Sequence, residues 1–209
     1  MSEVTGHIET DVRERLLVTA ERLFREIGYQ KTTVADIARA LRMSPANVYR
    51  FFDSKKSINL GVARRLMGQV EAESQAIAQA SGSATKRLRE LLTTIHRMNA
   101  ARYVADAKMH EMVAVAMEEN WDVCRPHIEY ITGVIAKVIT DGIVAGEFQV
   151  SDTNLAAACT STAMISFFHP QLIAESADMP GPTLDQMIDF VMAALQPRNR
   201  EGRPVIRRP

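Results

Sequence analysis

Apolar residues recur at the three- and four-residue spacing of an α-helix along most of the chain, and no alternating strand pattern stands out. Asp11 with Glu14 predicts the start of the first helix, and Gly28 predicts its end, because glycine accepts the left-handed backbone that follows many helices. We therefore expect a first helix over about 11–27. Its apolar stripe consists of Leu16, Leu17, Ala20, Leu23, Phe24 and Ile27.

Two short helices separated by a tight turn are expected next. Thr33 is a suitable N-cap for a helix of about eight residues that ends near Leu41. Ser44 is a suitable N-cap for a helix over 45–51, and Pro45 suits its first position because the N–H that proline lacks would have no helical partner there. This arrangement is the helix-turn-helix pattern, in which the second helix enters the major groove of DNA.

The same periodicity predicts helices through the rest of the chain. They are expected over 55–80, 85–102, 104–117, 123–145, 154–168 and 184–195, with His169-Pro170 closing the helix that begins at 154. The fold class is therefore all-α. We expect an N-terminal three-helix helix-turn-helix DNA-binding domain in residues 1–54, a helical domain in 55–196 and a basic tail in 197–209.

Charge is distributed unevenly, although the formal net charge is zero. Residues 31–56 carry six basic and two acidic side chains, a net of +4, and the tail from Pro197 onward is also +4. Residues 57–196 carry ten basic and sixteen acidic side chains, a net of −6. DNA should attract the helix-turn-helix segment and repel the acidic body, which favours double-stranded DNA as a partner in one orientation.

The composition favours a cytoplasmic location. No apolar stretch approaches the roughly 20 residues of a membrane span, so no membrane partner is expected. The N-terminus lacks the basic and then apolar pattern of a secretory signal. Two cysteines, Cys124 and Cys159, are too few for a disulfide scaffold and fit a reducing compartment.

The stretch from Thr32 to Ala38, TTVADIA, and the stretch from Ser44 to Lys56, SPANVYRFFDSKK, resemble the DNA-binding domain of the tetracycline-repressor (TetR) family over roughly residues 10–60. The resemblance implies a transcriptional regulator, most simply a repressor that a small molecule releases from its operator. The sequence departs from the family at Arg42, where a glycine commonly permits a left-handed turn.

The resemblance implies DNA contacts at particular positions. Tyr49 and Lys55 are expected to bind phosphates, and so is Thr33 through its hydroxyl or the start of its helix. Asn47 is expected to contact an adenine edge, Arg50 a guanine edge or the DNA backbone, and Pro45 and Ala46 to offer apolar contact. Val48, Phe51 and Phe52 are expected in the core.

The resemblance also implies that the helical domain encloses a small-molecule site and forms a homodimer. The helices 154–168 and 184–195 are expected to make the two-fold interface, with Phe167 and Val191 in it. Methionines that recur in the middle of the chain either line the site or fill the core. The candidate ligand residues are Met98, Arg102, Met109, His110, Met112, Trp121, Tyr130 and Phe167.

Two other classes remain open. Cys124 and His127 lie three positions apart and could serve a metal or thiol site, although a metal site normally needs three or four ligands. An architectural DNA protein without a ligand is disfavoured by the acidic body. No glycine-rich phosphate loop, nucleophile elbow or paired-histidine zinc motif is present, so neither an enzyme nor a cofactor is expected.

Overall fold

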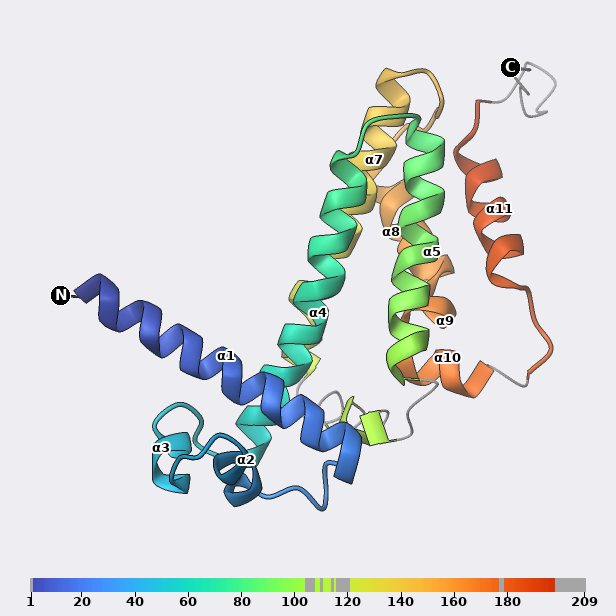
Figure 1. Ribbon diagram of the computed structural model, residues 1–209. Helices are drawn as coiled ribbons and strands as arrows, with labels where there is room; N and C mark the ends of the chain where they lie inside the picture. Colours follow the sequence, from blue (N-terminus) through green and yellow to red (C-terminus); the bar gives the residue numbers. More distant parts are fainter. Residues whose placement is uncertain are drawn as a thin grey trace. The chain divides into compact units, whose positions relative to one another are not determined.

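The computed structural model describes residues 2–103, 108–109, 111–113, 115, 121–176 and 179–197, and the regular structure in these ranges is entirely helical. The all-α prediction is confirmed (Figure 1). The helices are α1 (Ser2–Ile27), α2 (Val34–Ala40), α3 (Pro45–Tyr49), α4 (Lys55–Gln79), α5 (Ala84–Tyr103), α7 (Trp121–Val144), α8 (Thr153–Ala163), α9 (Ile165–Phe168), α10 (Pro170–Ser176) and α11 (Leu184–Leu195).

The chain forms two compact units. Unit 1 comprises Met1–Gly68 and Ala105–Cys124, and unit 2 comprises Gln69–Val104 and Arg125–Pro209. The first part of α4 therefore belongs to the compact unit that contains the helix-turn-helix. The functional boundary expected after residue 54 stays a prediction.

Unit 1 has a core built from one face of each of its helices. Residues of α1 such as Phe24, of α2 such as Ile37, of α3 such as Val48 and of α4 such as Ile58 are fully buried. Gly61 permits the close approach of α4 to α1, because an added Cβ would lie 2.6 Å from Leu17 Cδ2.

The start expected for α1 is wrong. The helix begins at Ser2, so Asp11 lies inside it and is no N-cap; its carboxylate lies 4.0 Å from Arg15 Nη1 instead. An Asp and an Arg four residues apart lie on one helix face and stabilise the helix. The pair therefore favours a helix that already includes Asp11 over one that starts there. The end is confirmed: Gly28 follows the helix with a φ of +101°.

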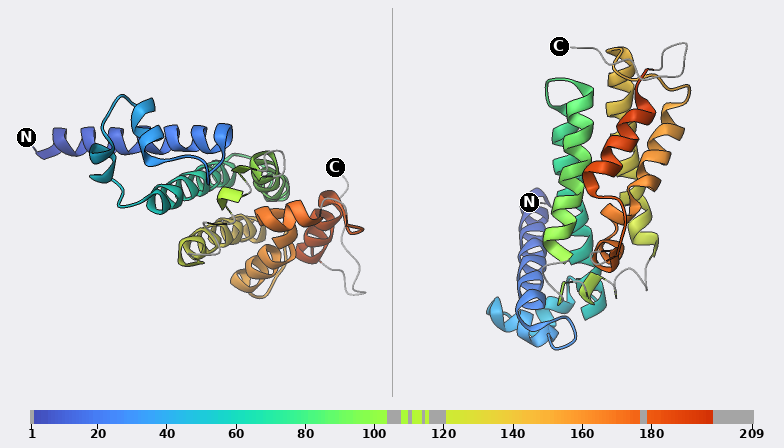
Figure 2. Two further views of the ribbon diagram at one scale, coloured as in Figure 1. Left: turned by 90° about the horizontal axis from the view of Figure 1, so that it is seen from below. Right: turned by 90° about the vertical axis from the view of Figure 1, so that its right-hand side faces the viewer.

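In unit 2, α5, α7, α8 and α11 run alongside one another around an apolar core (Figures 1 and 2). A turn after α7 locks one end of this bundle. Gly142 makes room for the buried Phe148 ring, since an added Cβ would lie 2.1 Å from it. The turn also aims Glu147 at the start of α5, where its carboxylate accepts hydrogen bonds from Ser83 Oγ at 2.6 Å and from the N–H groups of Ala84 and Thr85 at 3.0 and 2.9 Å.

The single helix expected over 154–168 is divided. α8 ends at Ala163, with the buried Met164 as its C-cap, and α9 and α10 follow. Pro170 was expected to close a helix, but it begins α10, which fits the preference of proline for a first helical position. Of the expected helix 104–117, only residues 108–109, 111–113 and 115 are described, and these are helical. Among the described helices, none is long and apolar enough to cross a membrane.

Candidate DNA interface and helical partner unit

The turn between α2 and α3 ends α2 with a left-handed residue. Arg42 has a φ of +56°, its N–H donates to Arg39 O at 3.1 Å, and the N–H of Met43 donates to Ala38 O at 3.0 Å. These two bonds form the Schellman motif, whose left-handed position is usually a glycine. The chain therefore keeps the turn at Arg42 in spite of the missing glycine, and the arginine side chain is exposed.

Thr33 begins α2 with a capping box. Its Oγ1 accepts from the Asp36 N–H at 3.1 Å and donates to Asp36 Oδ2 at 2.6 Å, while its own N–H donates to the same carboxylate at 3.0 Å. The Thr33 hydroxyl, with help from the Thr33 N–H and Arg39, holds the pKa of Asp36 below its ordinary value. The cap predicted at Thr33 is confirmed, and the residue is exposed.

α3 is capped as predicted and presents the residues expected to contact DNA. Ser44 Oγ accepts from the Asn47 N–H at 3.2 Å, and Pro45 occupies the first turn. The buried Val48 holds the helix on the core, as predicted. The remaining side chains lie toward solvent: Pro45, Ala46, Tyr49 and Arg50 are exposed and Asn47 is half-buried. Of the other predicted core residues, Phe52 is buried and Phe51 is half-buried.

Lys55, expected to bind a phosphate, also has a structural role that the sequence did not reveal. Its Nζ donates to the carbonyl oxygens of Tyr29 and Gln30 at 3.0 and 3.2 Å and lies 4.5 Å from the centre of the Tyr29 ring. The ammonium thus fastens the start of α4 to the loop after α1. A cation over an aromatic face is itself a favourable contact.

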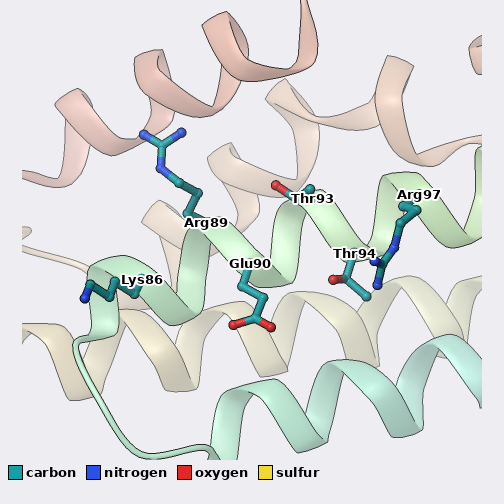
Figure 3. A pocket seen from close by; sticks show the side chains of 6 residues that line it. All are labelled: Lys86, Arg89, Glu90, Thr93, Thr94 and Arg97. Atoms are coloured by element: carbon teal, nitrogen blue, oxygen red, sulfur yellow. The ribbon is translucent and has the colours of Figure 1, made fainter.

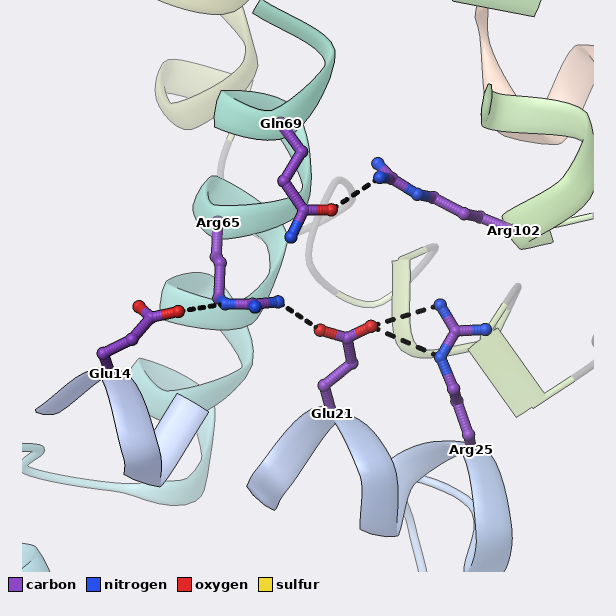
Figure 4. A network of polar contacts seen from close by, with 6 residues as sticks. All are labelled: Glu14, Glu21, Arg25, Arg65, Gln69 and Arg102. Atoms are coloured by element: carbon purple, nitrogen blue, oxygen red, sulfur yellow. Dashed lines mark hydrogen bonds and ion pairs between the residues drawn. The ribbon is translucent and has the colours of Figure 1, made fainter. Parts of the chain in front are cut away.

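Arg65 fastens α4 to α1 further along (Figure 4). Its Nε donates to Glu14 Oε1 at 2.5 Å and its Nη1 to Glu21 Oε2 at 2.6 Å. Glu21 also accepts from Arg25. Because Glu21 and Arg65 are both shielded from solvent, these ion pairs are screened less than exposed ones. α4 is therefore held to the helix-turn-helix scaffold as far as Arg65.

Several predicted ligand residues lie in unit 1. Met109 and Met112 are fully buried there, and the Met112 carbonyl accepts from Asn59 Nδ2 at 3.1 Å. His110 and the side chain of Trp121 lie outside the described residues. For Met109 and Met112 the burial fits the core-filling alternative.

The other predicted ligand residues lie in unit 2, where each has different contacts. Tyr130 is 42% exposed. Arg102 Nη2 donates to Gln69 Oε1 at 2.6 Å (Figure 4), and Met98 packs against the unit 2 core. Phe167 stacks edge-on against His96, with ring centres 5.9 Å apart.

A polar cluster lies beside Phe167, and the sequence did not reveal that its members come together. His96 Nδ1 lies 3.0 Å from the Phe167 carbonyl oxygen, and Asn99 Nδ2 donates to Phe168 O at 2.8 Å. Burial lowers the pKa of the neighbouring His169, and among the described residues its buried Nδ1 has no hydrogen-bond partner. The signal available in the sequence was the three-residue spacing of His96 and Asn99, which places them on one face of α5.

A shallow hollow runs along α5, and all its lining side chains come from that one helix (Figure 3). Arg89 is ion-paired to Asp189 of α11. A surface lined by a single helix encloses no ligand, so this hollow differs from the concave sites that hold small molecules. Its lining residues are Lys86, Arg89, Glu90, Thr93, Thr94 and Arg97.

The metal or thiol alternative gains no support from the described residues. Burial raises the pKa of the Cys124 thiol, which disfavours the reactive thiolate. His127 Nδ1 lies 2.7 Å from Glu71 Oε1. Within the described ranges, no three His, Cys, Asp or Glu side chains are grouped so as to hold a metal ion.

These features define a helix-turn-helix protein. The second helix of the motif, α3, is exposed, and the chain also contains a separate helical unit. Comparison with known families agrees. Residues 16–62 match the family described as bacterial regulatory proteins, tetR family, and residues 84–187 match the tetracyclin repressor-like C-terminal domain. The chain belongs to the TetR family of transcriptional regulators.

Individual relatives are more distant. Over 47 residues the chain is 43% identical to IcaR of Staphylococcus aureus, a negative transcriptional regulator of a biofilm operon; the match covers 22% of this chain and about a quarter of IcaR (25%). A regulator from Mesorhizobium loti shares 16% identity with a TM-score of 0.63, over 89% of this chain and 94% of its own. A regulator from Saccharomonospora viridis in complex with choline shares 22% identity with a TM-score of 0.57, over 87% and 94%. These two structures show the common fold.

Proposed function

We propose that this chain is a homodimeric repressor that binds an operator through α3 and leaves it when a small molecule binds. The observation that carries the proposal is the exposed face of α3, which offers Asn47, Tyr49 and Arg50 to solvent while Val48 is buried. The local charge of +4 in residues 31–56 supports a polyanionic partner. Its site of action would be the DNA of the cytoplasm.

Within this proposal the DNA contacts have separate tasks. Tyr49, Lys55 and Thr33 would bind phosphates and set the register, whereas Asn47 and Arg50 would read base edges. Pro45 and Ala46 would offer apolar contact, for example to a thymine methyl. The hydroxyl and the N–H of Thr33 both donate to the Asp36 carboxylate, so a phosphate at Thr33 would have to take over one of these donors.

A dimer through α8 and α11 is supported by apolar side chains that the unit 2 core leaves exposed. The two helices pack against each other. Leu155 of α8 is 61% exposed and Phe190 of α11 is 67% exposed. Val191, expected in the interface, is wrong for that role, because it is buried in the core of its own unit at 4% exposure. Neighbouring positions on a helix face different directions, so Phe190 takes its place.

A small-molecule effector is supported by the family and by its fold neighbours, of which the Saccharomonospora viridis protein was crystallised with choline. The proposal names unit 2 and no particular pocket. His96, Asn99 and His169 are the polar groups there that we add to Met98, Arg102 and Phe167 as candidates.

The proposal is tested by fluorescence anisotropy with the DNA upstream of the chain's own gene. The purified protein should bind this fragment in preference to a shuffled one, and a screen of small cations, phenols and acyl compounds should yield one that weakens binding. By linkage, the operator must weaken binding of that compound by the same factor. A protein that binds both fragments alike is no operator-specific regulator.

A further inference from the structure

Charge is segregated within unit 2. α5 carries five basic side chains and one acidic side chain, a net of +4. The other residues of unit 2 up to position 196 carry two basic and ten acidic side chains, a net of −8. Surfaces of opposite charge attract each other, so the basic helix of one molecule is complementary to the acidic remainder of unit 2 in a second copy.

The hollow along α5 is part of this basic helix (Figure 3). Its lining residues recur at the three- and four-residue spacing that places them on one helix face. Arg89 leans toward α11, where it is ion-paired to Asp189. Among the described residues, Lys86, Glu90 and Arg97 are exposed and have no ion-pair partner. The face therefore presents a positive, a negative and a positive charge in chain order.

This order of charges favours a protein partner. A nucleic acid presents a uniform row of phosphates, which Glu90 in the middle of the face would repel. A small molecule would not be enclosed, because all the lining side chains come from one helix. A partner helix can instead place an acidic side chain opposite Arg97 and a basic side chain opposite Glu90, so that both charges are paired.

The exposed face of α7 carries such a pair of charges, with a glycine between them. The exposed residues of this face are Glu129, Tyr130, Gly133 and Lys137. A glycine weakens a helix, and no described atom lies within 4 Å of a Cβ added at Gly133, so its small size serves no packing within the chain. It leaves room for a second copy to approach α7 closely. The matching position on α5 is Thr93, a half-buried residue at the centre of the hollow.

The two faces are complementary when the helices of two copies run antiparallel. With the centre of the hollow over Gly133, Arg97 lies opposite Glu129, and Glu90 lies within one position of the place opposite Lys137. Both pairs then have opposite charges. In a parallel arrangement with the same centre, Arg97 would face Lys137 and Glu90 would lie beside Glu129, so both pairs would repel. The charges therefore determine the direction in which the helices pair.

We propose that α5 of one molecule binds α7 of a second copy in this antiparallel arrangement, with Arg97 also over the exposed ring of Tyr130. Neither helix belongs to the interface proposed for α8 and α11, so under the proposed function the contact joins one homodimer to the next. Because the two faces differ, the contact is heterologous and can repeat. Exposed ion pairs are individually weak, so the contact forms at high protein concentration and not at the dilution of an unfolding measurement.

Sedimentation equilibrium of the full chain at rising protein concentration tests the contact without DNA. At low salt the average mass of the wild type should rise with concentration, and salt at about 0.5 M should reverse the rise because it screens exposed charges. Glu90→Lys and Lys137→Glu should each lower the association constant by about three- to tenfold, because an attractive pair becomes repulsive. The double variant Glu90→Lys/Lys137→Glu, in which the pair is opposite in charge again, should recover the wild-type constant.

The double variant Glu73→Lys/Lys137→Glu is the matched control. Glu73 is exposed on α4, and this variant has the same net charge as Glu90→Lys/Lys137→Glu. Its association should stay as weak as that of Lys137→Glu alone, because Glu90 would still face a like charge. Recovery in both double variants would show that net charge alone governs association and would overturn the contact. A wild-type mass that is the same at every concentration would overturn it as well.

DNA with two operators gives a second readout, which rests on the proposed function. Two homodimers on neighbouring sites are held at a high effective concentration, so a weak contact is enough to favour binding of the second. As the distance between the sites is varied, the wild type should bind cooperatively at some distances and Glu90→Lys at none. Independent binding by the wild type at every distance would contradict this role. Failure of the wild type to bind any operator would instead overturn the proposed function and leave the sedimentation result standing.

Discussion

Lys55 Nζ lies 3.0 Å from the carbonyl oxygen of Tyr29 and 4.5 Å from the centre of its ring, although 26 residues separate the two in the chain. A side chain expected to bind DNA therefore also holds the scaffold together. Under the proposed function, the Lys55 ammonium both bonds the loop after α1 and binds a DNA phosphate. Its removal should therefore lower both the stability of the chain and its affinity for DNA.

For Lys55→Ala we expect a loss of about 1–2 kcal/mol in the free energy of unfolding, because hydrogen bonds from a charged donor are lost. The slope of log affinity against log salt should fall by roughly one unit, for one lost phosphate contact. Urea denaturation and salt-dependent anisotropy measure the two effects. Lys56→Ala, at the exposed neighbouring position, is the control for general charge. A reduced stability with an unchanged slope would restrict Lys55 to its internal role.

Arg42→Gly should stabilise the chain. A non-glycine residue in the left-handed region costs about 1–2 kcal/mol, and the greater freedom of glycine in the unfolded chain returns part of this. We expect a net gain of about 0.5–1 kcal/mol. Arg39→Gly, in the last turn of α2, should lose about 1 kcal/mol because its backbone is helical. Thermal unfolding that lowers the Tm of Arg42→Gly as much as that of Arg39→Gly would be incompatible with this account.

Glu147 makes stability depend on pH. Burial alone would raise the pKa of Glu147, but the hydrogen bonds from Ser83, Thr85 and Ala84 outweigh it and hold the pKa at about 2, below the ordinary 4.5. A lowered pKa in the folded state stabilises the chain at neutral pH, and this contribution is lost as pH falls from about 4.5 toward 2.

Glu147→Gln should therefore lose about 1–2 kcal/mol at pH 7, after allowance for partial exposure, and the difference from the wild type should shrink below pH 4. Urea denaturation at several pH values measures it. Glu129→Gln, at an exposed site of α7, serves as the control. A Glu147→Gln difference that is the same at pH 3 and pH 7 would show that the carboxylate charge is not what caps α5.

Assembly can be tested at Leu155 and Phe190. An aspartate at either exposed position should leave the fold intact and yield monomers by light scattering, because a charge would be buried in the proposed interface. Val144→Asp, at an 85% exposed apolar site on α7, should remain dimeric. Val191→Asp should instead unfold the chain, since Val191 is in the unit 2 core. Dimers of both Leu155→Asp and Phe190→Asp would place the interface elsewhere.

Local signals in the sequence predicted the helix-turn-helix well. The caps at Thr33 and Ser44 and the end of α1 at Gly28 are confirmed, because such caps depend on bonds between residues two to four positions apart. The break at Met164 was missed, since it reflects packing of a buried residue that helical periodicity does not reveal. The start of α1 was missed because the Asp11 pattern suits both a cap and an ion pair within a helix.

The sequence predicted the candidate site less well than the fold, because several of its contacts join residues that are far apart in the chain. The bonds of Lys55 to Tyr29 and of Arg65 to Glu14 join residues 26 and 51 positions apart. Met109 and Met112 could not be distinguished from pocket residues, because a methionine in a core and one in a cavity follow the same helical spacing. Val191 was expected in an interface but is buried, whereas its neighbour Phe190 is exposed, because two adjacent apolar positions can both fit an apolar stripe.

Direct competition between the upstream DNA and a shuffled fragment, measured by anisotropy at fixed salt, tests the central claim that α3 reads an operator. The wild type should prefer the upstream fragment by about 10³-fold or more. Arg50→Ala and Asn47→Ala should each relax the preference at particular positions by about 1–3 kcal/mol, whereas Arg39→Ala on α2 should not. Equal affinity of the wild type for both fragments, or an unchanged preference in Arg50→Ala and Asn47→Ala, would contradict it.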